Sequence, residues 1–312
     1  MKVCIFGAGG VGAYFGARLL QANIDVTFIA RGQHLAVMRS NGLKVSGISG
    51  EFSLPDINAV EHPKANSPYD LVILAVKAWQ VKDAAKSLLG ALSKSAIVVP
   101  LQNGVEAPDD LAEVLGDEPV TIGLCGIVSL LKEPGHVFHA GVEPFIKIGE
   151  RNGSSSDRVD KIVALLNRAE GINASNSNDI RIPYWQKFMF IVTMSGIGSV
   201  TRAPIGVTRE NEDTRKLMEA CAREVYLIAC AQGIPMPSDS VEKTMITIDG
   251  APADATASMQ RDVASGKPSE LYNQNVAVTR LGKAVGVATP VNEFIGAALQ
   301  PQEKRARGNL NF

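Results

Sequence analysis

A lysine opens the longest apolar segment of the chain. Lys187 follows Trp185 and Gln186, and apolar residues fill most positions from Phe188 to Val200. A helix that is apolar on all sides is buried, and a lysine in its first turn lies near the positive end of the helix dipole. The dipole and the loss of solvent both favour the neutral amine, so Lys187 could donate a proton near neutral pH. A lysine that extends from a helix end into water is the alternative.

Two polar residues in the second half of the chain stand at predicted helix starts. Ser258 begins a short helical stretch that ends before Gly266, and Glu270 lies in the first turn of a helix predicted over 269–285. In that turn the helix dipole would stabilise the carboxylate of Glu270. Each residue also has a structural explanation, Ser258 as a helix cap and Glu270 as an acid favoured by the dipole. Neither position alone assigns a function.

A glycine-rich segment lies between a strand predicted over 2–6 and a helix predicted over 13–21. It consists of Gly7, Ala8, Gly9, Gly10, Val11 and Gly12. In that context the GxGxxG spacing is typical of a dinucleotide-binding βαβ unit. The first glycine makes the turn, the second admits a pyrophosphate, and the third lets the helix pack on the strand. The phosphates would then accept from the free N–H groups at the helix N-terminus.

The residue after the second predicted strand distinguishes the two nicotinamide dinucleotides. NAD sites usually place an acid there to bind the ribose 2′-hydroxyl. This chain has Arg31 after the strand predicted over 25–29. An arginine fork can bind two oxygens of a 2′-phosphate, so the sequence favours NADPH over NADH. An arginine on a solvated loop is the alternative.

Two further polar residues follow apolar strands of the kind that parallel sheets bury. The strand predicted over 69–76 ends at Lys77, and the strand predicted over 96–100 is followed by Asn103 and Gly104. In open α/β sheets, ligands bind beyond the carboxyl ends of the strands. Both side chains are therefore expected at the ligand-binding edge, although Asn-Gly is equally typical of a simple turn.

The alternation of strands and helices stops near residue 174. Before it, further strands are predicted over 120–127 and 145–148, with a hairpin turn region formed by 136–141 together with Pro134 and Gly135. After it, helices are predicted over 185–200, 214–232, 236–247, 258–264 and 269–285, with a last helix opened by Thr289 and Pro290. The sequence therefore predicts an α/β fold class: an N-terminal Rossmann domain with a doubly wound sheet over 1–174, and a C-terminal all-helical domain over 175–312.

Composition excludes several classes of protein. The net charge of −1 gives no bias toward nucleic acid or anionic membranes, and no apolar run has transmembrane length without Gly, Pro or a charge. The N-terminal glycines argue against a signal peptide. Four cysteines without CxxC spacing are expected to be reduced core thiols of a cytoplasmic protein: Cys4, Cys125, Cys221 and Cys230. The four histidines form one close pair, so no metal site is expected.

In combination these segments resemble the ketopantoate reductase (2-dehydropantoate 2-reductase) family. The resemblance covers nearly the whole chain. It rests on GAGGVG at 7–12, Val76-Lys77, Leu101-Gln102-Asn103-Gly104, Trp185-Gln186-Lys187, and Ala257-Ser258-Met259 with Asp262 and Glu270, in the family's order. It implies a Rossmann domain, a helical domain and a site in the cleft between them. It also implies NADPH-dependent reduction of 2-dehydropantoate to (R)-pantoate, a step in pantothenate and coenzyme A biosynthesis.

The resemblance implies a role for each candidate residue. Lys187 would be the general acid, and Glu270 its catalytic partner and an anchor for a substrate hydroxyl. Ser258 would contact the substrate carboxylate, Arg31 would bind the 2′-phosphate, and Lys77 and Asn103 would lie near the nicotinamide and the substrate. An ammonium beside the alkoxide that hydride transfer leaves can stabilise and protonate it. The expected partner is a small 2-oxo acid, and a homodimer is compatible with this reading.

The chain departs from the family at two positions of the apolar helix. Well-studied members carry asparagines one and two turns after the lysine, whereas this chain has Ile191 and Ser195. The change removes a hydrogen-bonding group that such a site uses for discrimination. One alternative is therefore a reductase of another 2-oxo acid or ketone on the same scaffold. A second is an NADPH-binding sensor without turnover, which the presence of Lys187 and Glu270 disfavours.

Overall fold

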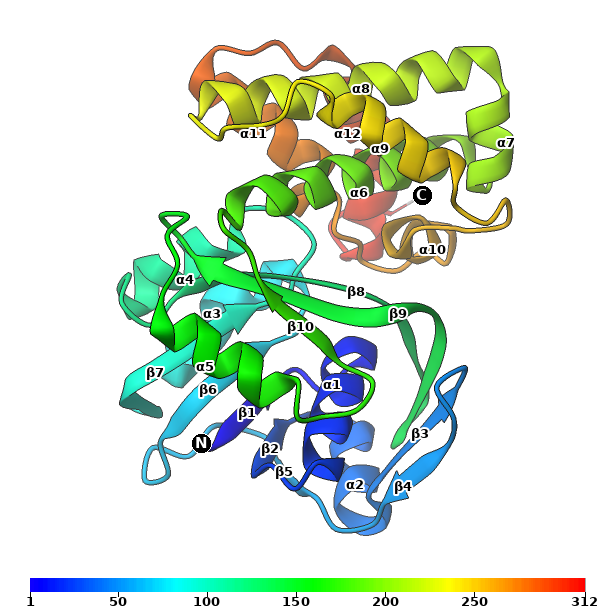
Figure 1. Ribbon diagram of the computed structural model, residues 1–312. Helices are drawn as coiled ribbons and strands as arrows, with labels where there is room; N and C mark the ends of the chain where they lie inside the picture. Colours follow the sequence, from blue (N-terminus) through cyan, green and yellow to red (C-terminus); the bar gives the residue numbers. More distant parts are fainter. Residues whose placement is uncertain (312) are drawn as a thin grey trace. The chain divides into compact units, whose positions relative to one another are not determined.

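The computed structural model describes residues 1–311, and the chain divides into two compact units (Figure 1). Unit 1 comprises residues 1–102 and 106–180, and unit 2 comprises residues 103–105 and 181 onward. The units therefore divide at residue 180 rather than at the expected residue 174. The difference arises because strand β10 (Asn173–Asn176) pairs with strand β9 (His136–Glu150) inside unit 1.

Unit 1 contains a fully parallel sheet in the order β5-β2-β1-β6-β7. Its strands are β1 (Val3–Phe6), β2 (Val26–Ile29), β5 (Asn58–Val60), β6 (Tyr69–Leu74) and β7 (Leu92–Pro100). Alternate residues of β1 enter two different apolar clusters: Ile5 packs with residues of α1 (Gly10–Gln21), and Cys4 with residues of α3 (Val81–Leu88). Both faces of the sheet are thus covered, which confirms the predicted Rossmann-type architecture.

A second sheet of unit 1 contains a long hairpin, β8 (Thr121–Glu133) and β9, which Figure 1 shows as two neighbouring ribbons. Strands β3 (Leu43–Gly47) and β4 (Phe52–Leu54) extend this sheet. The predicted hairpin turn is confirmed at Pro134 and Gly135 but does not extend over 136–141, because these residues form the first part of β9, which pairs with β8 and β3. Pro134 and Gly135 alone make the turn, and Gly135 has φ +77° as this kind of turn requires. Helices α2 (Gly32–Asn41), α4 (Ala107–Leu115) and α5 (Asp157–Leu166) complete the unit.

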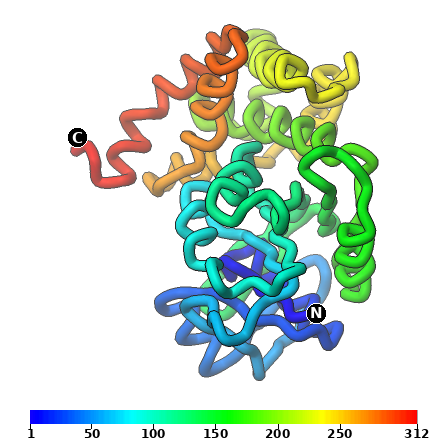
Figure 2. Tube along the Cα trace, turned by 90° about the vertical axis from the view of Figure 1, so that its left-hand side faces the viewer, coloured from blue at the N-terminus to red at the C-terminus, as the bar shows by residue number. Residues whose placement is uncertain are grey.

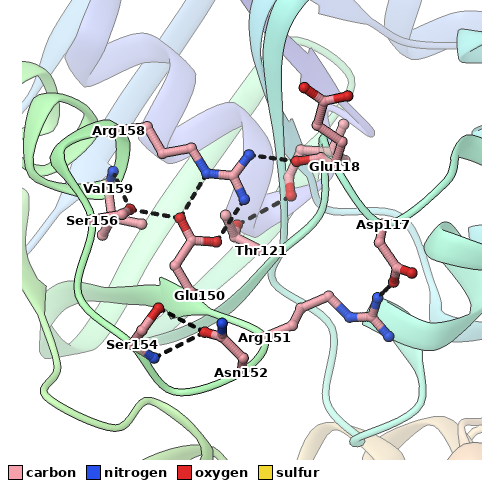
Figure 3. A network of polar contacts seen from close by, with 11 residues as sticks. Asp117, Glu118, Thr121, Glu150, Arg151, Asn152, Ser154, Ser156, Arg158 and Val159 are labelled. Atoms are coloured by element: carbon pink, nitrogen blue, oxygen red, sulfur yellow. Dashed lines mark hydrogen bonds and ion pairs between the residues drawn. The ribbon is translucent and has the colours of Figure 1, made fainter.

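An ionic network fastens the end of β9 to the start of α5 (Figure 3). Arg158 donates to both oxygens of Glu150, through Nε at 2.6 Å and Nη2 at 2.5 Å. Ser156 donates to the same carboxylate at 2.6 Å, and its oxygen caps α5 by accepting from Val159 N–H at 3.3 Å. Arg158 holds the pKa of Glu150 below its ordinary value.

Unit 2 is helical, as predicted, and Figure 2 traces it from green to red. Its helices are α6 (Arg181–Thr201), α7 (Ile205–Glu210), α8 (Glu212–Ala231), α9 (Ser240–Asp249), α10 (Ser258–Ala264), α11 (Asn275–Val285) and α12 (Pro290–Ala306), with a 3₁₀ turn, η2 (Leu271–Asn273). The apolar helix α6 packs against α7, α8, α9, α10 and α12. Its central position explains why it has no polar face.

The structure corrects two expectations, one about the helix predicted over 269–285 and one about Cys230. The helix predicted over 269–285 is interrupted at Gln274, whose φ of −114° and ψ of −102° are not helical. Cys230 is exposed rather than part of the core, while the other three cysteines are buried and all four are free thiols. Within residues 1–311, no helix combines the length and the apolar character that crossing a membrane requires.

Candidate functional site

The glycine-rich loop lies where three neighbouring parallel strands end. Gly7 follows β1 with φ +100°, and a Cβ there would be 2.8 Å from Val76 N, beyond the end of β6. The N–H groups of Gly7 and Ala8 both donate to Ile29 O at the end of β2. Since β2, β1 and β6 are adjacent in the sheet, the loop, Arg31 and Lys77 follow the same sheet edge.

The glycines of the loop have separable roles. A Cβ on Gly12 would be 2.1 Å from Gly7 O, so glycine there allows the loop to close over the helix start. Apart from Gly9 itself and its two chain neighbours, no described residue has a heavy atom within 4 Å of a Cβ built on Gly9, which is exposed. Gly9 is the N-cap of α1, whose first turn has no acidic residue. The open side of this helix N-terminus is suited to an anionic group.

Gly10 is required by the protein itself. A Cβ on Gly10 would be 2.4 Å from Ser129 O of β8, and Ser129 Oγ donates to Gly10 O at 2.8 Å. The β8–β9 hairpin thus packs directly on the glycine-rich loop. The GxGxxG pattern does not reveal this contact, because Gly10 occupies a variable position of the pattern.

His34 on α2 joins the same loop to the β8–β9 turn. Its Nε2 donates to Ala8 O at 2.8 Å, and its Nδ1 accepts from Gly135 N–H at 2.9 Å. This pair of contacts requires the neutral ring with the proton on Nε2. Burial lowers the pKa of His34, against the smaller opposing effect of the Ala8 bond. The sequence did not predict this role, since a lone histidine belongs to no motif.

Arg31 and Lys77 differ in how the chain holds them. Arg31 is exposed and is the extended N-cap residue of α2. Lys77 is half-buried, and its ammonium lies 5.8 Å from the ring centroid of Trp79. Just before Lys77, Gln102 Nε2 donates to Leu74 O and Val76 O, both at 3.0 Å. The buried Gln102 therefore fixes the end of β6, a role that the sequence analysis did not assign.

Lys187 lies on α6, but the expectation that the helix dipole favours its neutral amine is wrong. Helix α6 begins at Arg181, so Lys187 is in the second turn, and the effect of a helix dipole falls off within the first. Lys187 is half-buried, as is Ile191 one turn later, while Ser195 is fully buried. The three residues are therefore neighbours along one side of α6, and their exposure decreases from the half-buried Lys187 and Ile191 to the fully buried Ser195.

Glu270 is 5% exposed, and the expectation that a helix dipole stabilises its carboxylate is also wrong. The residue precedes the η2 turn with φ −91° and ψ 23°, and the regular helix α11 starts only at Asn275. Asn103 belongs to the same unit: a Cβ on the next residue, Gly104, would be 2.9 Å from Asn273 O. Residue 104 thus lies beside the segment that follows Glu270.

Ser258 is the first residue of α10 and is half-buried. The N-cap of that helix is Ala257, so the structure does not support the alternative of Ser258 as a helix cap. Unit 2 therefore holds Asn103, Lys187, Ser258 and Glu270, whereas unit 1 holds the glycine-rich loop, Arg31 and Lys77.

The hydroxyl of Ser195 is engaged inside unit 2. Its oxygen lies 2.6 Å from Ile191 O and 2.5 Å from Gln274 Oε1, and its single proton can serve one of them. Gln274 has no exposed surface, and its Nε2 has no hydrogen-bond partner among the described residues. The neighbouring Asn275 donates to Asn292 Oδ1 at 2.9 Å and Val192 O at 3.3 Å. These contacts fix the Gln274 segment against α6.

This fold and these residues define a class of proteins with a Rossmann-like first unit and a helical second unit. Family models described as "Ketopantoate reductase PanE/ApbA" and "Ketopantoate reductase PanE/ApbA C terminal" match residues 3–153 and 179–303. The chain belongs to this family of oxidoreductases. The family predicted from the sequence is confirmed.

Individual relatives match over almost their whole length. The uncharacterized oxidoreductase YkpB of Bacillus subtilis (strain 168) is 28% identical over 306 residues, covering 97% of this chain and 99% of YkpB. The crystal structure of a PanE/ApbA family ketopantoate reductase from Ralstonia eutropha JMP134 is 30% identical, with a TM-score of 0.88 and coverage of 98% and 100%. D-Mandelate dehydrogenase, solved with NADH and anilino(oxo)acetate, is 22% identical, with a TM-score of 0.90 and coverage of 98% and 99%. At that identity the similarity concerns the fold alone.

Proposed function

We propose that the protein is an NADPH-dependent reductase that converts a small 2-oxo acid to the 2-hydroxy acid. The first candidate substrate is 2-dehydropantoate, reduced to (R)-pantoate for pantothenate and coenzyme A biosynthesis. The observation that carries the proposal is membership of the ketopantoate reductase family across nearly the whole chain, with Lys187 and Glu270 both present.

The residues of unit 1 fit a nicotinamide dinucleotide. The accessible backbone at Gly9 and the N–H groups of the α1 N-terminus can bind a pyrophosphate. Arg31, at the end of the neighbouring strand, has the donor geometry for a ribose 2′-phosphate. When bound, the dinucleotide supplies a hydride to the carbonyl carbon of the substrate.

The residues of unit 2 supply the proton and hold the substrate. The ammonium of Lys187 stabilises the developing alkoxide and gives it a proton, which yields the hydroxyl of the product. Glu270 acts as the catalytic partner of that lysine and accepts from a substrate hydroxyl. Ser258 donates to the substrate carboxylate, and Asn103 donates to another substrate oxygen. In unit 1, Lys77 is the candidate for a contact near the nicotinamide.

A second candidate substrate is a 2-oxo acid whose side chain lacks a hydroxyl. Two observations favour it: Ile191 presents an apolar side chain one turn after Lys187, and the Ser195 proton is engaged by Ile191 O or Gln274 Oε1. A site that leaves a substrate hydroxyl without a partner binds that substrate less well.

Oxidation of NADPH in the presence of a substrate panel tests both candidates. The panel contains 2-dehydropantoate, 2-oxoisovalerate, which lacks its hydroxymethyl group, and phenylglyoxylate, which carries an aromatic ring. The highest kcat/KM for 2-dehydropantoate supports the first candidate, and the highest for either other acid supports the second. Tight NADPH binding without turnover of any 2-oxo acid would instead support the sensor alternative.

Titration with the two dinucleotides tests the cofactor preference. NADPH should bind more tightly than NADH. Arg31→Ala should weaken NADPH binding by roughly 1.5–3 kcal/mol, the range for a hydrogen bond to a charged group, and should change NADH binding little. The exposed neighbour Gln33 provides the control Gln33→Ala. Tighter binding of NADH by the unmutated protein would contradict the preference.

A further inference from the structure

A buried carboxylate on α12 holds the residue that precedes Glu270. Glu303 is 2% exposed, and its two oxygens accept from Ser269 N–H at 3.2 and 3.0 Å. Ser269 Oγ donates to the same carboxylate at 2.5 Å, and Ser269 has no exposed surface. Three contacts therefore fix the N–H and the side chain of Ser269 on one acid.

Arg307, one turn further along the chain, holds the other side of the same residue. Its Nε donates to Glu303 Oε1 at 2.6 Å, and its Nη2 donates to Ser269 O at 3.0 Å. Ser269 O belongs to the peptide group that carries the N–H of Glu270. The guanidinium also lies 5.7 Å from the ring centroid of Tyr272. The peptide groups on both sides of Ser269 are thus anchored by one ion pair.

This anchoring matters because no regular helix fixes the backbone of Glu270. Glu270 lies between the end of α10 and the η2 turn, and α11 begins only at Asn275. A carboxylate as buried as that of Glu303 is costly unless it is paired and fully hydrogen-bonded. Here its partners are Arg307 and the residue before Glu270, and the contacts continue through Leu271 N–H, which donates to Ser269 Oγ at 3.3 Å.

We propose that Glu303 and Arg307 are positioning residues for Glu270: the ion pair sets the direction in which the Glu270 carboxylate leaves the backbone. The inference rests on the proposed function, in which Glu270 acts on Lys187 and on the substrate. The family match ends at residue 303, so Arg307 lies beyond it.

The test compares Arg307→Met and Arg307→Lys with Glu270→Gln in the full-length protein. Lys304→Met is the matched control, because it removes an exposed cation from the same helix. Arg307→Met should lower kcat/KM by roughly 10–100-fold, the cost of a small misplacement of a reacting group, and should leave NADPH affinity unchanged. The pH–rate profile of Arg307→Met should also change: the fall in activity on its alkaline side should shift in the same direction as in Glu270→Gln. Arg307→Lys should recover part of the activity, since an ammonium can still pair with Glu303.

A double-mutant cycle separates positioning from general stability. Once Glu270 is Gln, adding Arg307→Met should cost little further turnover, because a positioning residue acts through the group that it positions. Fully multiplicative losses would overturn the inference. Impaired Glu270→Gln together with normal Arg307→Met would overturn it while leaving the proposed function standing.

Hydrogen exchange gives a result that does not depend on turnover. Arg307→Met should raise amide exchange at residues 269–273, and Lys304→Met should not. Unchanged exchange would overturn the inference whatever the activity. If exchange rises in Arg307→Met but the unmutated protein turns over no 2-oxo acid, the anchoring of residues 269–273 is supported and the proposed function is contradicted. If Arg307→Met fails to fold, Arg307→Lys carries both measurements.

Discussion

At the scale of single residues, His34 makes the glycine-rich loop sensitive to pH. The ring bonds Ala8 O and Gly135 N–H only when it is neutral. Because burial lowers the pKa of His34 in the fold, its contribution to stability is complete above the unfolded value of 6.5 and is lost as the pH falls. Protonation of Nδ1 would remove the acceptor for Gly135 N–H.

NADPH affinity should therefore weaken on the acid side of pH 6.5, once the pH reaches the lowered pKa of His34 in the unmutated protein. The expected loss is roughly fivefold, equivalent to one hydrogen bond of about 1 kcal/mol. His34→Gln should bind more weakly at all pH values and should lose this acid-side dependence. Fluorescence titration on both sides of pH 6.5 measures it. An identical pH dependence in His34→Gln would show that another group is responsible.

Lys187→Ala should remove turnover while leaving the fold and NADPH affinity nearly intact. The side chain is half-buried, so its removal opens no closed cavity in the core. The rate should fall by roughly 10²–10⁴, the usual contribution of a placed general acid. Steady-state kinetics, melting temperature and cofactor titration check the three parts. If Lys187→Ala keeps near-normal turnover, or if the alkaline side of its pH–rate profile is unchanged, then Lys187 is only a solvated helix residue.

The sequence singled out candidate site residues but did not predict their surroundings. The roles of Lys187 and Glu270 come from the family resemblance and stay predictions, whereas the expected effect of a helix dipole on each is wrong because both helix starts lie elsewhere. Gly10 was assigned to the nucleotide-binding loop, but glycine is required there because any Cβ would clash with the carbonyl of Ser129 in β8. His34 and Glu303 were not found, since neither stands in a recognisable motif. His34 bonds backbone atoms far away in the chain, and Glu303 bonds the N–H and hydroxyl of the distant Ser269 as well as the nearby Arg307.

At the scale of elements, the network between β9 and α5 should stabilise unit 1. Arg158→Met should lower the free energy of unfolding by about 1–2 kcal/mol, because the pair is partly solvent-screened. Arg158 lowers the pKa of Glu150, so the contribution is complete above the unfolded value of 4.5 and is lost as the pH falls below it. Denaturant unfolding at pH 7 and below pH 4.5 measures both effects.

The control is Lys161→Met, which removes an exposed cation from α5. It should change the unfolding free energy little at either pH. If Arg158→Met keeps the same deficit below pH 4.5, its effect comes from lost packing of the side chain and not from the ion pair.

Strands made mainly of consecutive apolar residues, such as β1 and β6, were predictable because a buried parallel strand is apolar on both faces. Two other elements were not predicted. Strand β10 has the sequence Asn-Ala-Ser-Asn, which is typical of a loop, and pairing with β9 makes it a strand. Helix α3 does carry the apolar spacing of an amphipathic helix at Val81, Ala84 and Leu88, a signal that could have found it.

At the scale of the whole molecule, the candidate residues divide by unit. Asn103 belongs to unit 2 although the chain around it belongs to unit 1. Asn103→Ala should therefore lower kcat/KM by roughly tenfold, equivalent to about 1.4 kcal/mol, and should change NADPH affinity little. Cofactor titration beside steady-state kinetics checks this. Equal losses in both quantities would indicate a structural role for the turn.

The contact between Gly10 and Ser129 has a consequence for engineering of the glycine-rich loop. A loop transplanted from another dehydrogenase would bring its own residue to position 10, and any side chain there would meet the carbonyl of Ser129. The hairpin would then have to move before the new loop could close. A successful graft must keep glycine at this position or carry the matching β8 segment with it.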